Sequence, residues 1–320
     1  MYYKITNEKE NHRGFQYSDG LNILKDDFNN DPNKSCCKGG LYFTDAANIF
    51  EFLNYGIYLR EITLPTSDEN FCMVKNKNNK WRANMIVLGE RHELSNVNTF
   101  KLLIEKGADI HANNDYALRW SANNGLLEIV KLLIENGADI HVYNDSALGL
   151  SAENGHLEIV KFLVEKGADI HANNDFALHQ SAKNSHLEIV KFLVEKGADI
   201  HADNDCALRW SAINGHLEIV KLLIENGADI HAKNDYALVW SANNGHLNVV
   251  QFLVEKGADI HADNDCALRW SAERGHLDVV QSLIEKGADI HVHNDYALKL
   301  SAENGHLEVV KLLKSLSSKN

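Results

Sequence analysis

Proline is nearly absent from this chain of 320 residues, which contains only 2, and residues 84–320 contain none. Long apolar runs are missing as well. No stretch of about 18 consecutive apolar residues occurs, so we expect no membrane-spanning helix. The N-terminus, MYYKITNEKENHRG, is polar and has no apolar core, so no secretory signal is visible. Together these absences favour a soluble intracellular protein.

Cysteine is scarce, with 5 residues that form no paired pattern. An odd number of cysteines without a secretory signal indicates reduced thiols. The adjacent Cys36 and Cys37 lack the C-x-x-C spacing of a zinc site. Cys206 and Cys266 occupy equivalent positions of a repeat, where we expect small packing residues. A reactive thiol at these two positions is the alternative.

Positive charge is in short supply, since the formal net charge is −13. Residues 1–90 carry a net charge of −1, so the rest of the chain carries −12. A strongly acidic surface repels phosphate backbones, so nucleic acid is not an expected partner. A neutral or basic protein surface fits better.

The chain does contain a repeat of 30 residues, which begins at Asn114 and continues without insertion. Its marker, GADIH, occurs seven times, from residues 107–111 to residues 287–291. A short period kept in phase predicts stacked helical units, in which each repeat contacts its neighbours, rather than a globule.

The second half of each repeat predicts an amphipathic helix. In the repeat of residues 234–263, apolar residues recur at helical spacing, at Leu247, Val250, Leu253 and Val254. Gly257 suits the left-handed position that ends many helices.

The first half of the same repeat predicts a shorter helix, from Tyr236 to Asn243, with Asp235 as the N-cap. Asn244-Gly245 is expected to form the turn between the two helices. Residues 258–264 are expected to cross to the next repeat as an extended loop or a tight hairpin.

Two histidine columns follow the repeat. The GADIH histidines could form a metal column, a pH sensor or part of the scaffold; they are His111, His141, His171, His201, His231, His261 and His291. Side chains one repeat apart, about 8–10 Å, do not converge on zinc, so no metal is expected. A pH response stays open, because histidine changes charge near neutral pH. The histidines of the NGH turns, such as His246, are expected to hydrogen bond to backbone at the turn.

Variation among the seven repeats divides the first helix into two faces. Four columns never change, those of Ala117, Leu118, Ser121 and Ala122, and we expect them to be buried. Four columns vary, those of Tyr116, Arg119, Trp120 and Asn123, and their spacing puts them on the opposite face.

The run NGHLEIVKLLIENGADIHAKND, residues 214–235, resembles the ankyrin repeat. The resemblance covers residues 84–320. It identifies 84–113 as a degenerate capping repeat, 114–293 as six regular repeats and 294–320 as a C-terminal capping repeat. It implies a mainly α solenoid of helix-turn-helix units with a concave protein-binding face, no catalysis and no cofactor. Two features depart from the family pattern. The repeat has 30 residues rather than 33, and CALRWSA replaces the T-P-L-H-x-A signature. We therefore expect a shorter hairpin between repeats.

The variable face supplies the candidate partner-binding residues: Trp120, Arg209, Trp210, Tyr236, Trp240, Arg269, Trp270 and Tyr296. Trp, Tyr and Arg are the usual anchors of protein interfaces. Trp210, Trp240 and Trp270 are expected to form a continuous aromatic ladder. Alternatively, the tryptophans fill the groove between helices, because Leu150 and Leu300 occupy the same column.

Residues 1–83 lack the repeat and predict a small α+β domain. We expect a helix over 45–55, a strand over 57–64 and two β-rich runs within 71–90. No nucleophile–base or phosphate-binding pattern stands out, so we expect no enzyme.

The motifs GGLYFTD (39–45) and RANMIVLGE (82–90), together with the repeats, are similar to ankyrin proteins of giant DNA viruses of the mimivirus kind. That similarity implies a monomer in the host cytoplasm that binds a host protein. It also leaves open an adaptor role, in which residues 1–83 recruit ubiquitin-ligase machinery.

Overall fold

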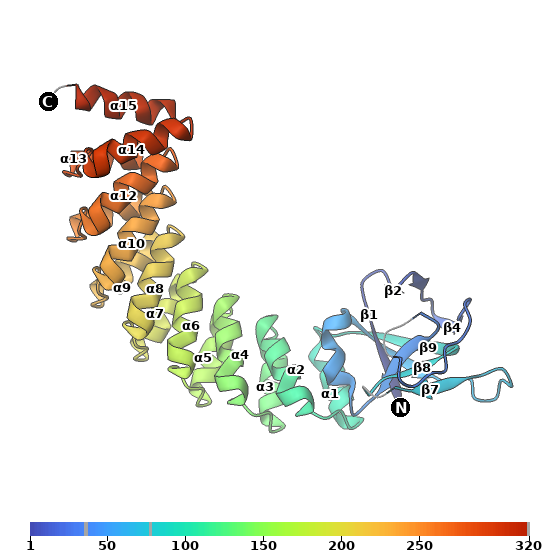
Figure 1. Cartoon of the computed structure of the whole chain (residues 1–320). Coiled ribbons are helices and arrows are strands. Elements are labelled where there is room, and N and C mark those ends of the chain that lie inside the picture. Colours follow the sequence, from blue (N-terminus) through green and yellow to red (C-terminus); the bar gives the residue numbers. More distant parts are fainter. Residues whose placement is uncertain (35–37, 77–78, 319–320) are drawn as a thin grey trace. The chain divides into compact units, whose positions relative to one another are not determined.

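A computed structural model describes residues 1–34, 38–76 and 79–318, so Cys36 and Cys37 lie outside the described residues. The chain divides into two compact parts, residues 1–147 and 148–320, which we call the first and second parts. Strands occur in the first part and helices dominate the second (Figure 1). The expected combination of a helical repeat array with a smaller strand-containing N-terminal domain is confirmed.

The N-terminal domain contains a seven-stranded sheet in which every observed pairing is antiparallel. A separate hairpin, β2 (Asn11–His12) and β3 (Phe15–Gln16), lies outside this sheet. The order of the sheet is β4 (Gly20–Ile23), β9 (Met85–Glu93), β6 (Tyr58–Thr63), β1 (Tyr2–Thr6), β5 (Leu41–Asp45), β8 (Trp81–Ala83) and β7 (Met73–Lys75). One sheet face packs on a core that includes Leu41, Phe43, Ile62, Ile86 and Leu88.

The sheet extends beyond the boundary expected at residue 83. Strand β9 continues to Glu93 and pairs with both β4 and β6. Met85, Ile86 and Leu88 are buried in the sheet, and this apolar run explains why the strand does not stop earlier. Residues 84–93 therefore belong to the N-terminal domain, and the capping repeat contributes only its second helix, α1 (Val97–Glu105).

The helix expected over 45–55 forms as a 3₁₀ helix, η1 (Ile49–Tyr55), and it stands where the first helix of the capping repeat is missing. It lies against α2 (Ala112–Asn123), the first helix of the following repeat (Figure 1). Phe50 of η1 stacks on Phe100 of α1 with ring centroids 5.2 Å apart, and both rings are fully buried. The N-terminal domain thus closes the first end of the repeat array.

The repeats contain two helices each, as expected. The second helices share an apolar stripe; they are α3 (Leu127–Glu135), α5 (Leu157–Glu165), α7 (Leu187–Glu195), α9 (Leu217–Glu225), α11 (Leu247–Glu255), α13 (Leu277–Glu285) and α15 (Leu307–Ser317). The first helices after α2 are α4 (Val142–Glu153), α6 (Ala172–Lys183), α8 (Ala202–Ile213), α10 (Ala232–Asn243), α12 (Ala262–Glu273) and α14 (Val292–Glu303).

Within the second part, first helices pack on first helices and second helices pack on second helices, so the array has two layers (Figure 1). The predicted buried face of the first helix is confirmed in the repeat of residues 234–263, where Ala237, Leu238, Ser241 and Ala242 are all at most 1% exposed. In the last repeat the equivalent Ala302 is exposed. Val250 and Leu253 of the second helix are fully buried. The helix ends before Gly257, whose φ of +101° matches the left-handed ending that the sequence predicts.

The connection between repeats differs from the extended loop or hairpin that we expected. Three consecutive residues adopt the left-handed helical conformation; in the repeat that begins at Asn234 they are Lys233, Asn234 and Asp235, with φ of 54°, 57° and 54°. We call this segment the left-handed turn, and it recurs from Asn113 to Asp295. Left-handed residues other than glycine cost about 1–2 kcal/mol each. Asn and Asp tolerate this region best, which explains why Asn-Asp is kept in every repeat.

Candidate functional site

The aspartate of the left-handed turn links its own repeat to the preceding one. Asp235 is 4% exposed, and its carboxylate accepts hydrogen bonds from Nδ1 of His231 (3.1 Å) and from the backbone N–H of Asp259 (2.8 Å). The prediction that Asp235 caps its own helix is therefore wrong. The carboxylate instead joins the GADIH segment of the preceding repeat, through His231, to the GADIH segment of its own repeat, through Asp259.

The GADIH histidines are part of this connection. Because a carboxylate can only accept, the Nδ1 of His231 must carry the proton. No group of His, Cys, Asp and Glu suited to a metal ion occurs among the described residues. The ring therefore fixes the turn, and the pH response of this column stays a prediction, to be checked by comparing melting temperatures at pH 7.5 and 5.5.

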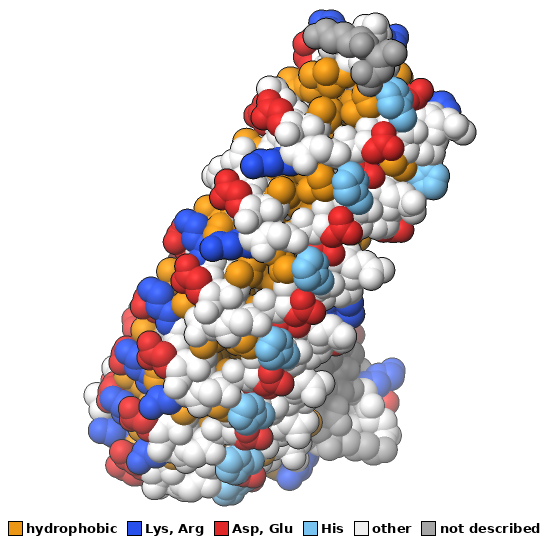
Figure 2. Space-filling view, turned by 90° about the vertical axis from the view of Figure 1, so that its left-hand side faces the viewer, with side chains coloured by type: hydrophobic (Ala, Val, Ile, Leu, Met, Phe, Trp, Pro, Cys, Tyr) orange, Lys and Arg blue, Asp and Glu red, His pale blue; other side chains and the backbone are white. Residues whose placement is uncertain are grey.

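The NGH histidines make the backbone hydrogen bonds that we expected. The Nε2 of His246 lies 2.9 Å from the carbonyl oxygen of Ile213 in the preceding repeat, so Nε2 donates. The ring also covers Gly215, where an added Cβ would lie 2.6 Å from the histidine Nδ1. Figure 2 shows histidine side chains in a row beside acidic side chains on one face of the helical part. Both columns thus serve the contacts between repeats.

The arginines of the variable face bind backbone. Arg209 is 7% exposed, and its guanidinium donates to the carbonyl oxygens of Asp203 (2.7 Å) and Asn204 (2.9 Å). Arg269 makes the same pair of hydrogen bonds to Asp263 and Asn264. These carbonyls belong to the left-handed turn, so the arginines that we expected to contact a partner stabilise the connection between repeats.

Three of the predicted aromatic residues form one group, the aromatic cluster, which consists of Tyr236, Trp240 and Trp270. The rings of Tyr236 and Trp240 lie 5.5 Å apart, and Trp240 meets Trp270 edge to face at 5.0 Å. The guanidinium of Arg209 lies 5.4 Å from the Tyr236 ring centroid. Mutual packing holds these side chains in fixed positions on the first-helix layer.

Trp210 lies outside this cluster, so the expected continuous ladder forms only in part. Among the described residues it makes no ring contact with Trp240, and the ammonium of Lys183 lies over its ring at 5.1 Å. Its residue surface is 38% exposed. Trp210 is therefore the tryptophan of the second part whose surface is most available.

The two remaining candidates differ from each other. Trp120, in the first part, stacks on the buried Phe100 at 6.1 Å, as expected for a side chain that fills the groove between helices. Tyr296 of α14 is 40% exposed.

One exposed aromatic residue of the second part was absent from the predicted site. Phe176 is 36% exposed and covers Gly149, where an added Cβ would lie 2.7 Å from its Cδ1. Phe176 occupies the same repeat column as Tyr236 and Tyr296. Its place in that variable column was enough to predict Phe176 as a candidate partner-binding residue.

The cysteines of the repeats are packing residues. Cys206 and Cys266 are 7% and 1% exposed. Burial raises the pKa of both thiols, that of Cys266 to about 11, which keeps them protonated at neutral pH. The alternative of a reactive thiol is not supported at either position.

No helix among the described residues is long and apolar enough to cross a membrane.

Comparisons with known proteins agree with this architecture. A family model of ankyrin repeats matches residues 91–174, 171–234 and 231–294. An uncharacterized protein of Acanthamoeba polyphaga mimivirus is 50% identical over 130 residues, which are 41% of this chain and 94% of that protein. Two putative ankyrin repeat proteins of the same virus are 47% and 42% identical over 41% of this chain, which covers only 64% and 46% of their lengths.

A solved structure shows the same fold. The crystal structure of the human ASB11 ankyrin repeat domain superposes with a TM-score of 0.54 at 23% sequence identity, covering 61% of this chain and 96% of that domain. The repeats, their two-layered packing and these matches lead to one conclusion. The chain belongs to the ankyrin-repeat family, whose members are typically non-enzymatic modules for protein–protein interaction.

Proposed function

We propose that the first-helix layer of the second part binds a host protein without catalysis, on the surface that is concave in ankyrin-repeat proteins. The observation that carries this proposal is the exposure of Trp210, at 38%, in a column where other repeats have Leu or Gln. The scaffold does not require tryptophan there. Exposed tryptophan and tyrosine are typical anchors of interfaces, and Tyr296 and Phe176 add to the same layer.

The charge of the chain restricts the partner. The net charge is −13, and Asp203, beside the Arg209 guanidinium, keeps a carboxylate side chain that is 54% exposed. Acidic rims attract basic surfaces and repel acidic ones. The proposed partner therefore presents an apolar pocket for an aromatic ring, bordered by neutral or basic residues.

Affinity capture with matched variants tests the proposal. The full chain is used to capture proteins from a lysate of the amoebal host, in parallel with the variant Trp210→Ala/Tyr296→Ala. The control is Leu307→Ala, which removes a side chain that is 67% exposed from the second-helix layer. We expect a partner that the wild type and the control retain and the double variant loses. Equal capture by all three chains would reject this surface.

The same experiment covers the alternative role as a ubiquitin-ligase adaptor. No described feature of the N-terminal domain favours that role. Recovery of a ligase subunit by all three chains would support an adaptor that binds the ligase elsewhere. Localisation of the tagged chain in infected cells tests the proposed host cytoplasm, and sedimentation tests the proposed monomer.

A further inference from the structure

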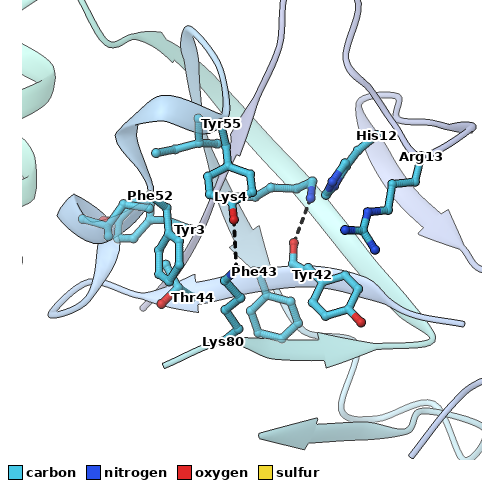
Figure 3. A pocket seen from close by; sticks show the side chains of 12 residues that line it. Tyr3, Lys4, His12, Arg13, Tyr42, Phe43, Thr44, Phe52, Tyr55 and Lys80 are labelled. Carbon is cyan, nitrogen blue, oxygen red and sulfur yellow. Dashed lines mark hydrogen bonds between the residues drawn. The ribbon is translucent and has the colours of Figure 1, made fainter. Parts of the chain in front are cut away.

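The N-terminal domain contains a hollow that the repeats do not explain (Figure 3). About 530 Å³ of space free of protein atoms belongs to it, a volume that includes open solvent at its mouth. Strands β1 and β5, helix η1 and the hairpin of β2 and β3 contribute to its lining. Phe52 and Tyr55 of η1 form an aromatic side of the hollow, with their rings 6.0 Å apart.

Four basic residues from three segments converge on this hollow: Lys4, His12, Arg13 and Lys80. The Lys4 ammonium donates to the carbonyl oxygen of Tyr42 at 2.8 Å, and the Lys80 ammonium lies 3.1 Å from the Tyr55 hydroxyl. Arg13 is exposed on the hairpin and forms no hydrogen bond or ion pair with another described residue. No Asp or Glu is present among the described lining residues.

Burial in the hollow disfavours the charged forms of Lys4 and His12, and nearby positive charge adds to this effect for His12. Lys4 is only 4% exposed, and burial lowers the pKa of its ammonium to about 7. Burial, followed by the positive charges of Lys4, Arg13 and Lys80, lowers the pKa of His12 to about 4. Like charges gathered in a partly desolvated space destabilise one another. These basic residues gather in one hollow although the chain as a whole carries a net charge of −13.

We propose that the hollow binds a small molecule in which an anionic group, a phosphate or a carboxylate, is attached to a planar ring. The Arg13 guanidinium binds the anionic group together with the Lys80 ammonium, which lies 4.9 Å from the Phe52 ring centroid and 5.0 Å from that of Tyr55. The ligand ring packs beside these two aromatic side chains, and Lys4 adds positive charge to the hollow. Charge-assisted hydrogen bonds of this kind are the strong ones in proteins. Aromatic side chains favour offset or edge-to-face contact with another ring. This site is separate from the protein-binding surface proposed above.

Calorimetric titration of the full chain tests the site with four probes: phenyl phosphate, benzoate, inorganic phosphate and phenol. We expect saturable binding of phenyl phosphate or benzoate, weaker binding of inorganic phosphate and none of phenol. Arg13→Gln should weaken the binding of the ring-bearing anion by about tenfold, because it removes a charge-assisted contact.

The matched control is Arg91→Gln. It also removes one guanidinium from this domain, but that guanidinium lies over the Tyr58 ring and outside the hollow. It should change the affinity less than twofold. The inference is overturned if neither ring-bearing anion binds. It is also overturned if Arg13→Gln and Arg91→Gln weaken binding equally, or if phosphate binds as tightly as phenyl phosphate.

Discussion

At the scale of single residues, most polar side chains of the repeat form hydrogen bonds that involve the left-handed turn. Its three residues would be unfavourable alone. In the repeat that begins at Asn204, the Asp205 carboxylate accepts from the Asp229 amide of the same repeat and from His201 of the preceding repeat. The Arg209 guanidinium donates to two carbonyls of the turn. These hydrogen bonds offset the conformational cost. The turn explains why polar residues recur at these positions of the repeat.

A substitution of Ser185 tests whether a left-handed residue other than glycine destabilises the turn between the two helices of a repeat. It has φ of +68° where the other NG turns have glycine, which adopts this conformation freely. We predict that Ser185→Gly stabilises the chain by about 1 kcal/mol, measured as a higher urea midpoint. The reverse change, Gly215→Ser, should destabilise the chain, since a Cβ there would also meet the His246 ring. If Ser185→Gly lowers the midpoint, the assignment of strain is wrong.

His179 tests the cost of a buried imidazole. It occupies the column of Arg209, it is 8% exposed, and its Nε2 has no hydrogen-bond partner among the described residues. Burial lowers its pKa. Between the lowered folded pKa and the ordinary unfolded value of about 6.5, only the unfolded chain binds the proton. Stability is therefore fully present above pH 6.5 and is lost as the pH falls.

We predict that the melting temperature of His179→Gln drops less between pH 7.5 and 5.5 than that of the wild type. The difference between the two chains isolates His179 from the exposed histidines. An equal drop in both chains would show that His179 does not contribute.

At the scale of elements, the contact between repeats depends on the turn aspartates as well as on apolar packing. Asp235→Asn keeps a residue that tolerates the left-handed conformation but removes the charge that accepts from Asp259 and His231. We predict a loss of about 1–2 kcal/mol in stability and faster hydrogen exchange at the Asp259 amide. Glu218→Gln, which breaks an exposed pair with Lys221, should cost less than about 0.5 kcal/mol.

The helices of the repeats could be predicted from sequence, whereas the connections could not. Val250, Leu253 and Gly257 specify the second helix through local spacing and a glycine ending. Asp235 resembles an N-cap in sequence, and only the structure shows that its carboxylate joins two successive GADIH segments. The arginine, tryptophan and tyrosine columns were recognised, but sequence alone could not separate Arg209, which binds backbone, from Trp210, which is exposed.

Helix η1 was recognised as a helix but not as part of the repeat array. Sequence periodicity compares equivalent positions of the repeats, and η1 lies outside the period. Its role depends on the stacking of Phe50 on Phe100, a contact across 50 residues.

Replacement of Phe50 tests whether the N-terminal domain closes the array. Phe50→Ala removes a fully buried ring, and such changes cost about 3–5 kcal/mol. We predict faster hydrogen exchange in α1 and α2. Exchange in α11 and α13 should not change, because repeats are stabilised mainly by their neighbours. Unchanged exchange in α1 would mean that η1 does not support the array.

At the scale of the whole molecule, the chain combines repeats that carry most of the negative charge with an N-terminal domain that is nearly neutral and contains a basic hollow. The second part presents exposed aromatic side chains on its first-helix layer, at Phe176, Trp210 and Tyr296. We interpret the repeats as the surface for a protein and the hollow as a separate site for a small anion.

The affinity of a captured partner for Trp210→Ala tests the central claim most directly. Trp210 is 38% exposed and lies outside the aromatic cluster, but the rest of its surface is buried, so its truncation should cost about 1–3 kcal/mol of stability in a chain that stays folded. If Trp210 is an anchor of the interface, the dissociation constant should rise at least about tenfold, while Leu307→Ala leaves it unchanged. An unchanged dissociation constant for Trp210→Ala, in a chain that circular dichroism shows to be folded, would contradict the proposed protein-binding surface.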